Sequence, residues 1–277
     1  MKQEKIYLTR HDYSGSFRWA LNEILLPKSF NLKMLLELPL DGIRSFLKVI
    51  PTAEEANDKL LAPIEPDQEV WASGVTYAHS RDAREIETEI KSIYQRVYEA
   101  PRPELFFKAV GWRTVGPNSP VRIRKDTSWN VPEPELVLIL NFTGEIVGYT
   151  LGNDVSSRDI EGENPLYLPQ AKNYDGSCAI GPGIVFMGAD ELRELLIEMT
   201  ITRNKKNVFQ KSTNTNQMKR TFEDLAGYLF REMTFPYGSF LMTGTGIVPP
   251  DDFTLHPGDC VKIKVGSLTL ENVVGHK

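Results

Sequence analysis

Most of the chain after residue 104 consists of short apolar segments that end at Gly, Pro or Asn. Segments of this kind are typical of β-strands, because the turn residues interrupt them before a long helix can form. A succession of short strands favours a sandwich or a rolled sheet over a helical bundle. We expect strands at residues 70–73, 105–109, 121–124, 136–140, 147–153, 184–187, 197–203, 208–212, 240–243 and 260–265.

Two segments break this pattern with helical spacing. One amphipathic helix is expected over residues 219–232, and a clearer one over residues 78–98. In the clearer helix, apolar side chains recur at intervals of four, three and four residues and so share one helix face: Ile86, Ile90, Ile93 and Val97. The predicted fold class is therefore mixed α+β and rich in β-structure.

The first 68 residues differ from the rest. Short helix-like patterns at residues 19–26, 32–38 and 54–61 are separated by prolines, and residues 63–67 have the character of a linker. We therefore expect a small N-terminal subdomain over residues 1–68, followed by a catalytic domain over residues 69–277.

Composition excludes several functional classes. A net charge of -5 argues against a nucleic-acid-binding protein, which usually carries a concentrated basic surface. No apolar run approaches the roughly 18 residues needed to span a membrane, and the first residues lack the apolar core of a signal peptide. Cys178 and Cys260 form no Cys-x-x-Cys pair, which fits a reducing compartment. We expect a cytoplasmic protein.

Three acids stand at the ends of two adjacent predicted strands. Glu133 and Glu135 are two residues apart, so on a strand both project from one face. A turn at residues 143–144 returns the chain, and Asp154 ends the second strand. Three carboxylates without His or Cys form a hard oxygen site, suited to Mg²⁺, Mn²⁺ or Ca²⁺. The alternative for the Glu pair alone is a solvated strand edge.

The order of motifs resembles the fumarylacetoacetate hydrolase superfamily from about Glu69 to the C-terminus, and closest to its branch of 2-keto-3-deoxy sugar-acid dehydratases. The wider resemblance lies in the segment with Glu133 and Glu135 and in residues 102–108, 148–159 and 243–246. The branch is indicated by residues 161–174 and 214–220. The resemblance implies a rolled mixed β-sandwich whose metal is held by Glu133, Glu135 and Asp154.

The resemblance also implies roles for three further residues. Lys172 corresponds to a site lysine that binds the anionic substrate, and Glu104 to a general acid/base. Thr245, in Thr-Gly-Thr-Gly, is expected to donate to the substrate carboxylate, with an ordinary tight turn as the alternative. For Glu104 the alternative is an ion pair with Lys108, while Lys108 is equally a candidate to orient the metal carboxylates.

The hydrolases of this superfamily activate water with a His and a Glu. In this chain Ser80 stands where the His belongs and Ala83 where the Glu belongs. His79 lies one residue early and could serve in its place only where the segment is not helical; on a helix it is a surface or structural histidine. A dehydratase needs no water nucleophile. The resemblance therefore favours elimination of water from a 2-keto-3-deoxy sugar acid through a metal-stabilised enolate, with a pentonate such as 2-keto-3-deoxy-D-arabinonate giving 2,5-dioxopentanoate.

Two other functions stay open. An acylpyruvate hydrolase or oxaloacetate decarboxylase shares the metal site, and a protein that binds a metal and a keto acid without turnover shares the ligand. The expected partners are a small 2-keto acid and further copies of the chain, as a dimer or tetramer by resemblance, without nucleic acid or membrane.

Overall fold

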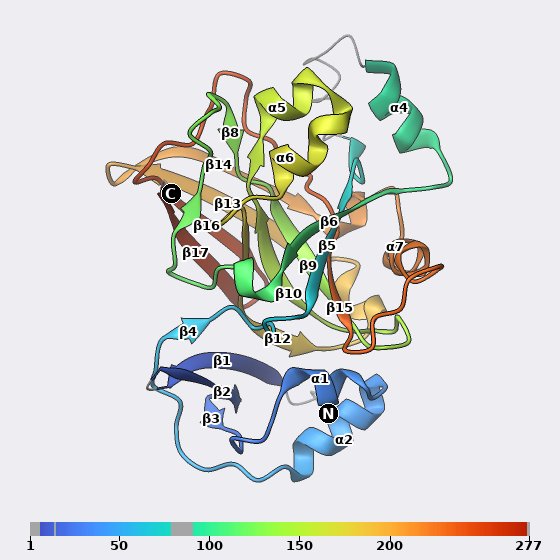
Figure 1. Ribbon diagram of the computed structural model, residues 1–277, viewed down its shortest axis with the longest axis vertical. Helices are drawn as coiled ribbons and strands as arrows, with labels where there is room; N and C mark the ends of the chain where they lie inside the picture. The colour runs from blue at the N-terminus through green and yellow to red at the C-terminus, as the bar shows by residue number, and fades with distance from the viewer. Residues whose placement is uncertain (1–5, 14, 79–90, 276–277) are drawn as a thin grey trace.

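The computed structural model describes residues 6–13, 15–78 and 91–275, and most of its strands belong to two sheets (Figure 1). The larger sheet contains β1 (Tyr7–Tyr13), β2 (Ser16–Leu21), β3 (Ile24–Leu25), β4 (Leu60–Leu61), β5 (Glu69–Gly74), β6 (Glu104–Val110), β9 (Pro134–Leu140), β10 (Ile146–Asp154), β12 (Cys178–Phe186) and β15 (Ser239–Met242). Its spatial order is β3-β2-β1-β12-β10-β9-β15-β5-β6, with β4 beside β1. Only β15 and β5 pair in parallel within this sheet as described.

The second sheet has five strands, in the order β14-β13-β16-β17-β7. They are β7 (Val121–Arg122), β13 (Leu196–Arg203), β14 (Lys206–Asn214), β16 (Cys260–Val265) and β17 (Leu268–Gly275). A short ladder pairs β8 (Asn130–Val131) with β11 (Ser156–Ser157). One hydrophobic core contains residues of both main sheets, so the two sheets pack face to face. The predicted mixed, β-rich fold class is confirmed.

Strand β9 lies in the middle of this packing and is buried on both faces. Leu136, Leu138 and Leu140 join the core between the sheets, whereas Val137 and Ile139 join a second core on the opposite face. The separation follows from the period of two along a strand. Because both faces are covered, β9 is almost continuously apolar, and packing on both sides fixes the position of its first residues.

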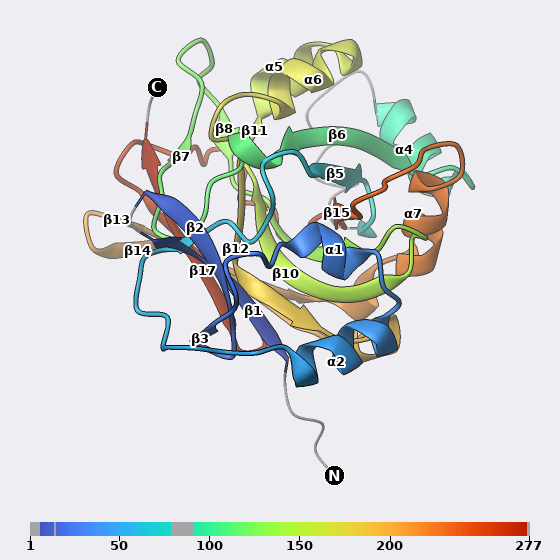
Figure 2. The same cartoon turned by 60° about the horizontal axis from the view of Figure 1, so that its bottom comes forward.

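The second core lies under the N-terminal part of the chain. Helices α1 (Leu32–Leu36) and α2 (Leu40–Val49) cover the face of the large sheet formed by β9, β10 and β12 (Figure 2). Strand β1 pairs with β12, with Tyr7 opposite Val185. The N-terminal strands therefore extend the large sheet, and the N-terminal helices share its core.

Two of the three helix-like patterns in this region are not helices. Residues 19–26 lie mostly in the β2–β3 hairpin, and residues 54–61 contribute only β4, whereas residues 32–38 do contain α1. The hairpin turns at Asn22 and Glu23, which have φ values of 47° and 70°. The spacing of apolar residues in a short run does not distinguish a helix from a strand, and Glu is not a residue type that indicates a turn.

The remaining helices among the described residues are short. They are α4 (Lys91–Glu99), η1 (Gly111–Arg113), α5 (Arg158–Glu163), η2 (Pro165–Tyr167), α6 (Leu168–Lys172), η3 (Ala189–Leu192), η4 (Thr215–Gln217) and α7 (Phe222–Leu229). Helix α4 is the described part of the helix expected over residues 78–98; residues 79–90, with His79, Ser80 and Ala83, lie outside the described residues. Helices α5 and α6 lie at the end of the molecule opposite β1–β3 (Figure 1). Among the described residues, no helix is long and apolar enough to cross a membrane.

Candidate metal and substrate site

The structure brings Glu133, Glu135 and Asp154 together. Glu133 immediately precedes β9, Glu135 is the second residue of β9, and Asp154 ends β10. The Asp154 amide donates to the Glu133 carbonyl oxygen at 2.9 Å, which fixes the two strand ends against each other. One carboxylate oxygen from each acid lies within 4.8 Å of the others, and all three side chains are buried.

Three buried carboxylates in contact require a positive charge close to them. Burial raises the pKa of Glu135 well above its usual value, and the neighbouring charges of Asp154 and Glu133 raise it further. The Gly244 amide donates to Glu135 and opposes that shift. Buried like charges persist when a cation lies between them, and a set of carboxylate oxygens is the donor set that Mg²⁺ and Ca²⁺ prefer. The cluster therefore fits a divalent cation.

Lys172, the last residue of α6, contacts two of the three acids. Its Nζ atom lies 3.0 Å from Glu133 Oε2 and 3.2 Å from Asp154 Oδ2, and it donates to Ser156 Oγ at 2.6 Å. A fully buried lysine is rare unless it is paired with acids. The structure thus places Lys172 beside the carboxylates, where an anionic substrate would meet both a metal ion and an ammonium group.

Lys108 is also completely buried, on β6. Its ammonium forms an ion pair with Asp154 and donates to the Lys172 carbonyl oxygen at 2.6 Å and the Val155 carbonyl oxygen at 3.2 Å. Lys108 thus contacts the segments that carry Asp154 and Lys172. Of the two sequence interpretations for Lys108, these contacts favour the orientation of site carboxylates over a pair with Glu104.

Sequence reasoning missed one member of the cluster, Arg158. Its Nη2 atom lies 3.0 Å from Glu133 Oε1 and its Nη1 atom 3.8 Å from Glu161 Oε2. The adjacent Asp159 accepts hydrogen bonds from Ser128 and Ser157. The sequence does indicate the contact of Arg158 with Glu161, because residues three apart meet on a helix, but it does not indicate the contact with Glu133.

Glu104 lines a cavity of about 390 Å³ next to this cluster. The cavity lies between α4, the start of β6 and the α5–α6 segment, and Glu161 lines it as well. Its other walls are mainly apolar, including Ile93, Val97 and Leu168. Through Arg158, Glu161 is linked to Glu133 of the carboxylate cluster. The cavity thus adjoins the cluster, with Glu104 on its wall.

Thr245 follows β15, and its hydroxyl is engaged locally. It donates to the Ile247 carbonyl oxygen at 3.2 Å and accepts from the Ile247 amide at 3.1 Å, as in a tight turn. The preceding Gly244 has φ 86°, and a Cβ there would lie 2.1 Å from Thr76 Oγ1. The glycine therefore permits the close approach through which its amide reaches Glu135.

Comparison with known proteins gives this geometry a context. Residues 69–275 match the family model described as fumarylacetoacetate (FAA) hydrolase C-terminal. The probable 2-keto-3-deoxyxylonate dehydratase of Haloferax volcanii is 49% identical over 209 residues, which cover 75% of this chain and 72% of that protein. The 2-dehydro-3-deoxy-D-arabinonate dehydratase of Saccharolobus solfataricus is 44% identical over 222 residues, which cover 77% of this chain and 74% of that protein.

Solved structures show the same fold over nearly the whole length. A 2-keto-3-deoxy-D-arabinonate dehydratase, complexed with magnesium and 2,5-dioxopentanoate, superposes with a TM-score of 0.82 at 34% identity, covering 98% of this chain and 99% of that one. The predicted rolled fold of the superfamily is confirmed. The chain belongs to the fumarylacetoacetate hydrolase family.

Proposed function

We propose that this protein is a Mg²⁺-dependent dehydratase that converts a 2-keto-3-deoxypentonate into 2,5-dioxopentanoate. The observation that carries the proposal is the buried cluster of Glu133, Glu135 and Asp154 with Lys172 against it. Relatives that are 49% and 44% identical are named as dehydratases of such acids, and a similar structure contains magnesium and 2,5-dioxopentanoate.

Glu133, Glu135 and Asp154 are the residues that would hold the ion. A divalent cation bound there would polarise the 2-oxo group of a keto acid and would stabilise the negative charge that develops when a C3 proton leaves. Lys172 supplies positive charge for the substrate carboxylate. We assign Thr245 a hydrogen bond to that carboxylate, which its hydroxyl would make in place of its bond to the Ile247 carbonyl oxygen. The buried position of Lys172 strengthens this attraction, because little water competes for the ammonium group.

Glu104 is assigned the proton transfers. It accepts the C3 proton, the bond between C4 and its hydroxyl oxygen breaks, and the hydroxyl leaves as water after protonation. In the unsaturated product, one proton then moves from C5 to C3 and the C5 hydroxyl proton moves to C4. The terminal alcohol thereby becomes the aldehyde of 2,5-dioxopentanoate, with loss of one water overall.

The experiment that tests this function compares substrates. The purified protein, supplied with Mg²⁺, is incubated separately with 2-keto-3-deoxy-D-arabinonate, its L isomer and an acylpyruvate, and the products are identified by mass spectrometry. Formation of 2,5-dioxopentanoate from a pentonate supports the dehydratase. Release of pyruvate from the acylpyruvate, with both pentonates unchanged, replaces it with the hydrolase. Binding of 2-ketobutyrate without turnover of any substrate supports the non-catalytic alternative.

The residue assignments have a test of their own. Glu133→Gln removes one charge from the cluster at nearly constant volume, so Mg²⁺ affinity measured by calorimetry should fall together with activity. Glu163→Gln, in the exposed end of α5, is the matched control and should change neither. Full Mg²⁺ affinity and activity in Glu133→Gln would remove Glu133 from the metal site.

We further propose a cytoplasmic homo-oligomer, a dimer or tetramer. The compartment is supported by two cysteines, both free in the structure, and the assembly by the family resemblance. Light scattering on the eluting protein measures the assembly directly, and a monomeric mass contradicts it.

A further inference from the structure

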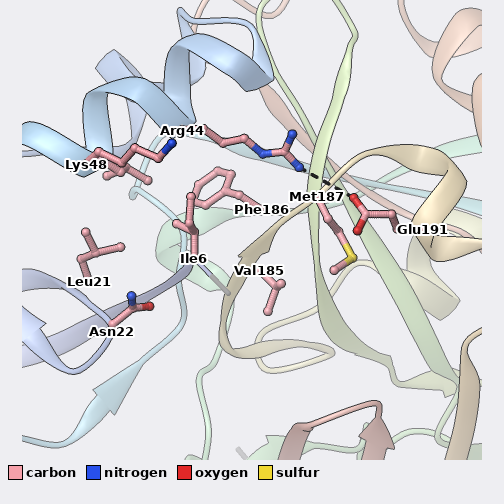
Figure 3. Close-up of a pocket in the computed structure, with 10 residues that line it drawn as sticks. Ile6, Leu21, Asn22, Arg44, Lys48, Val185, Phe186, Met187 and Glu191 are labelled. Carbon is pink, nitrogen blue, oxygen red and sulfur yellow. Dashed lines mark ion pairs between the residues drawn. The ribbon is translucent and has the colours of Figure 1, made fainter. Parts of the chain in front are cut away.

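Figure 3 shows a second cavity, of about 730 Å³. It lies at the other end of β12 from the carboxylates. Strand β12 begins at Cys178, opposite Asp154, and reaches the cavity at Val185. At about 3.3 Å per residue the cavity is roughly 20 Å from the carboxylate cluster. The cavity therefore belongs to a different part of the molecule, where the N-terminal segment meets the large sheet.

The walls of this cavity are largely apolar. Ile6 and Leu47 contribute from the N-terminal segment, Val185 and Phe186 from the end of β12, and Met187 from the residue that follows it. Ligand cavities in proteins typically have volumes of about 300–1,000 Å³, with apolar walls and a few polar groups that orient the ligand. The volume and the walls suit a small molecule with an apolar body.

Two cations of α2 stand together on one wall of the cavity. Arg44 and Lys48 are four residues apart and therefore share one helix face, as Figure 3 shows. Arg44 is largely sheltered, yet its only ion pairs within the described residues, to Asp41 and Glu191, are both 3.7 Å long. Those distances exceed a direct hydrogen bond. Among the described residues, neither Arg44 nor Lys48 has a hydrogen-bond acceptor.

We infer that this cavity binds a small amphiphilic monocarboxylate, its carboxylate between Arg44 and Lys48 and its apolar body against Val185 and Phe186. A guanidinium and an ammonium with unused donors form strong, charge-assisted hydrogen bonds with a carboxylate. The apolar part of the wall favours a hydrocarbon chain over a hydroxyl-rich sugar acid, because each buried hydroxyl needs a partner and only Asn22 and Glu191 are polar in the described lining besides the two cations. The ligand is therefore of a different class from the proposed substrate.

The test uses octanoate as the probe and calorimetry on the full-length protein. Octanoate should bind saturably, with one molecule per chain. Arg44→Met/Lys48→Met should weaken binding about tenfold or more, because the charge-assisted hydrogen bonds are lost. Lys206→Met/Lys264→Met, which removes two exposed cations of the second sheet, is the charge-matched control and should bind as the native protein does.

A second variant separates the cavity from the charges. Leu21→Trp places a larger side chain at the cavity wall while keeping both cations, and it should abolish octanoate binding. Equal binding by native protein, Arg44→Met/Lys48→Met and the control would overturn the inference, as would non-saturable binding. A native protein that binds no octanoate would overturn it as well. If the oligomeric mass also falls in Leu21→Trp, a second copy of the chain covers this face.

Discussion

At the residue scale, the site depends on cations that are buried as deeply as the acids they contact. Lys108, Lys172 and Arg158 each contact at least one carboxylate of the cluster. Charges are taken out of water only at a high cost, and close contact with opposite charge offsets it. The cluster is therefore a coupled set, in which removing one member changes the position and charge balance of the others.

Lys108→Met tests whether the members of the cluster are coupled, because Lys108 is assigned no contact with the substrate. The change removes one of the two lysines that contact Asp154 and frees the Lys172 carbonyl oxygen, so the Asp154 side chain and the backbone at Lys172 each lose a fixed contact. We expect kcat/KM to fall about 10- to 100-fold, the usual effect of removing a group that orients metal ligands. Steady-state kinetics at saturating Mg²⁺ measure it. Lys262→Met, at an exposed pair with Glu271, is the control, and native activity in Lys108→Met would contradict the role.

The buried thiol of Cys178 is expected to resist alkylation at pH 8. Burial raises the pKa of its thiol to about 12, and only the thiolate reacts with alkylating reagents. Because a raised pKa keeps the thiol protonated, Cys178 should stay unmodified by iodoacetamide at pH 8 and react only after unfolding. Peptide mass spectrometry distinguishes it from the less buried Cys260. Alkylation of Cys178 in the folded protein at the rate of Cys260 would contradict this account.

At the element scale, the site is assembled from strand ends held by a hairpin, and this part could be predicted from the sequence. The β9–β10 turn contains Gly144 with φ 84°, and Asn141 accepts hydrogen bonds from Thr143 and Glu145. Such local chemistry is visible in the residues themselves. Once the two strands pair, the position of Asp154 beside Glu133 follows.

Other elements could not be predicted because their cause is not local. The β2–β3 hairpin turns at two residues with positive φ, one of them Glu23, which has no preference for that conformation. The strand character of β2 comes instead from pairing with β1. Arg158 pairs with Glu133, which is 25 residues earlier in the chain, so no short spacing announces that contact.

Two glycines give a matched pair of tests at this scale. Gly244→Ala should cost about 1–3 kcal/mol in backbone strain alone, and more through the clash with Thr76, and it should lower activity by moving the amide that contacts Glu135. Gly227→Ala, in α7 with open space around it, should be neutral or stabilise by up to about 1 kcal/mol. Urea unfolding and kinetics measure both. Equal effects of the two changes would contradict the close approach of Gly244 to Thr76 and Glu135.

At the scale of the whole molecule, the two hydrophobic cores lie on opposite faces of the large sheet. The core beneath α1 and α2 contains Leu32, Leu35 and Ile43 together with Val137 and Ile139 of β9. Strand β9 therefore links the N-terminal segment to the carboxylate cluster through shared packing. We propose that the subdomain of residues 1–68 is a cover for this face and not an independently folding unit.

Deletion of residues 1–68 tests this proposal. Residues 69–277 alone would expose the apolar face of β9, β10 and β12, so we expect a product that aggregates or lacks a cooperative thermal transition. Far-UV circular dichroism and calorimetry are the measurements. A soluble fragment that unfolds cooperatively near the temperature of the full chain would show that the catalytic domain folds alone.

The central claim is that the buried carboxylate cluster makes this protein a metal-dependent dehydratase, and one measurement tests it most directly. The protein is stripped with EDTA, and 2,5-dioxopentanoate formation from 2-keto-3-deoxypentonate is followed as Mg²⁺ is added back. We predict no product without metal and a rate that rises and saturates with Mg²⁺. Equal turnover with and without metal, or no turnover of either pentonate isomer at saturating Mg²⁺, would contradict the claim.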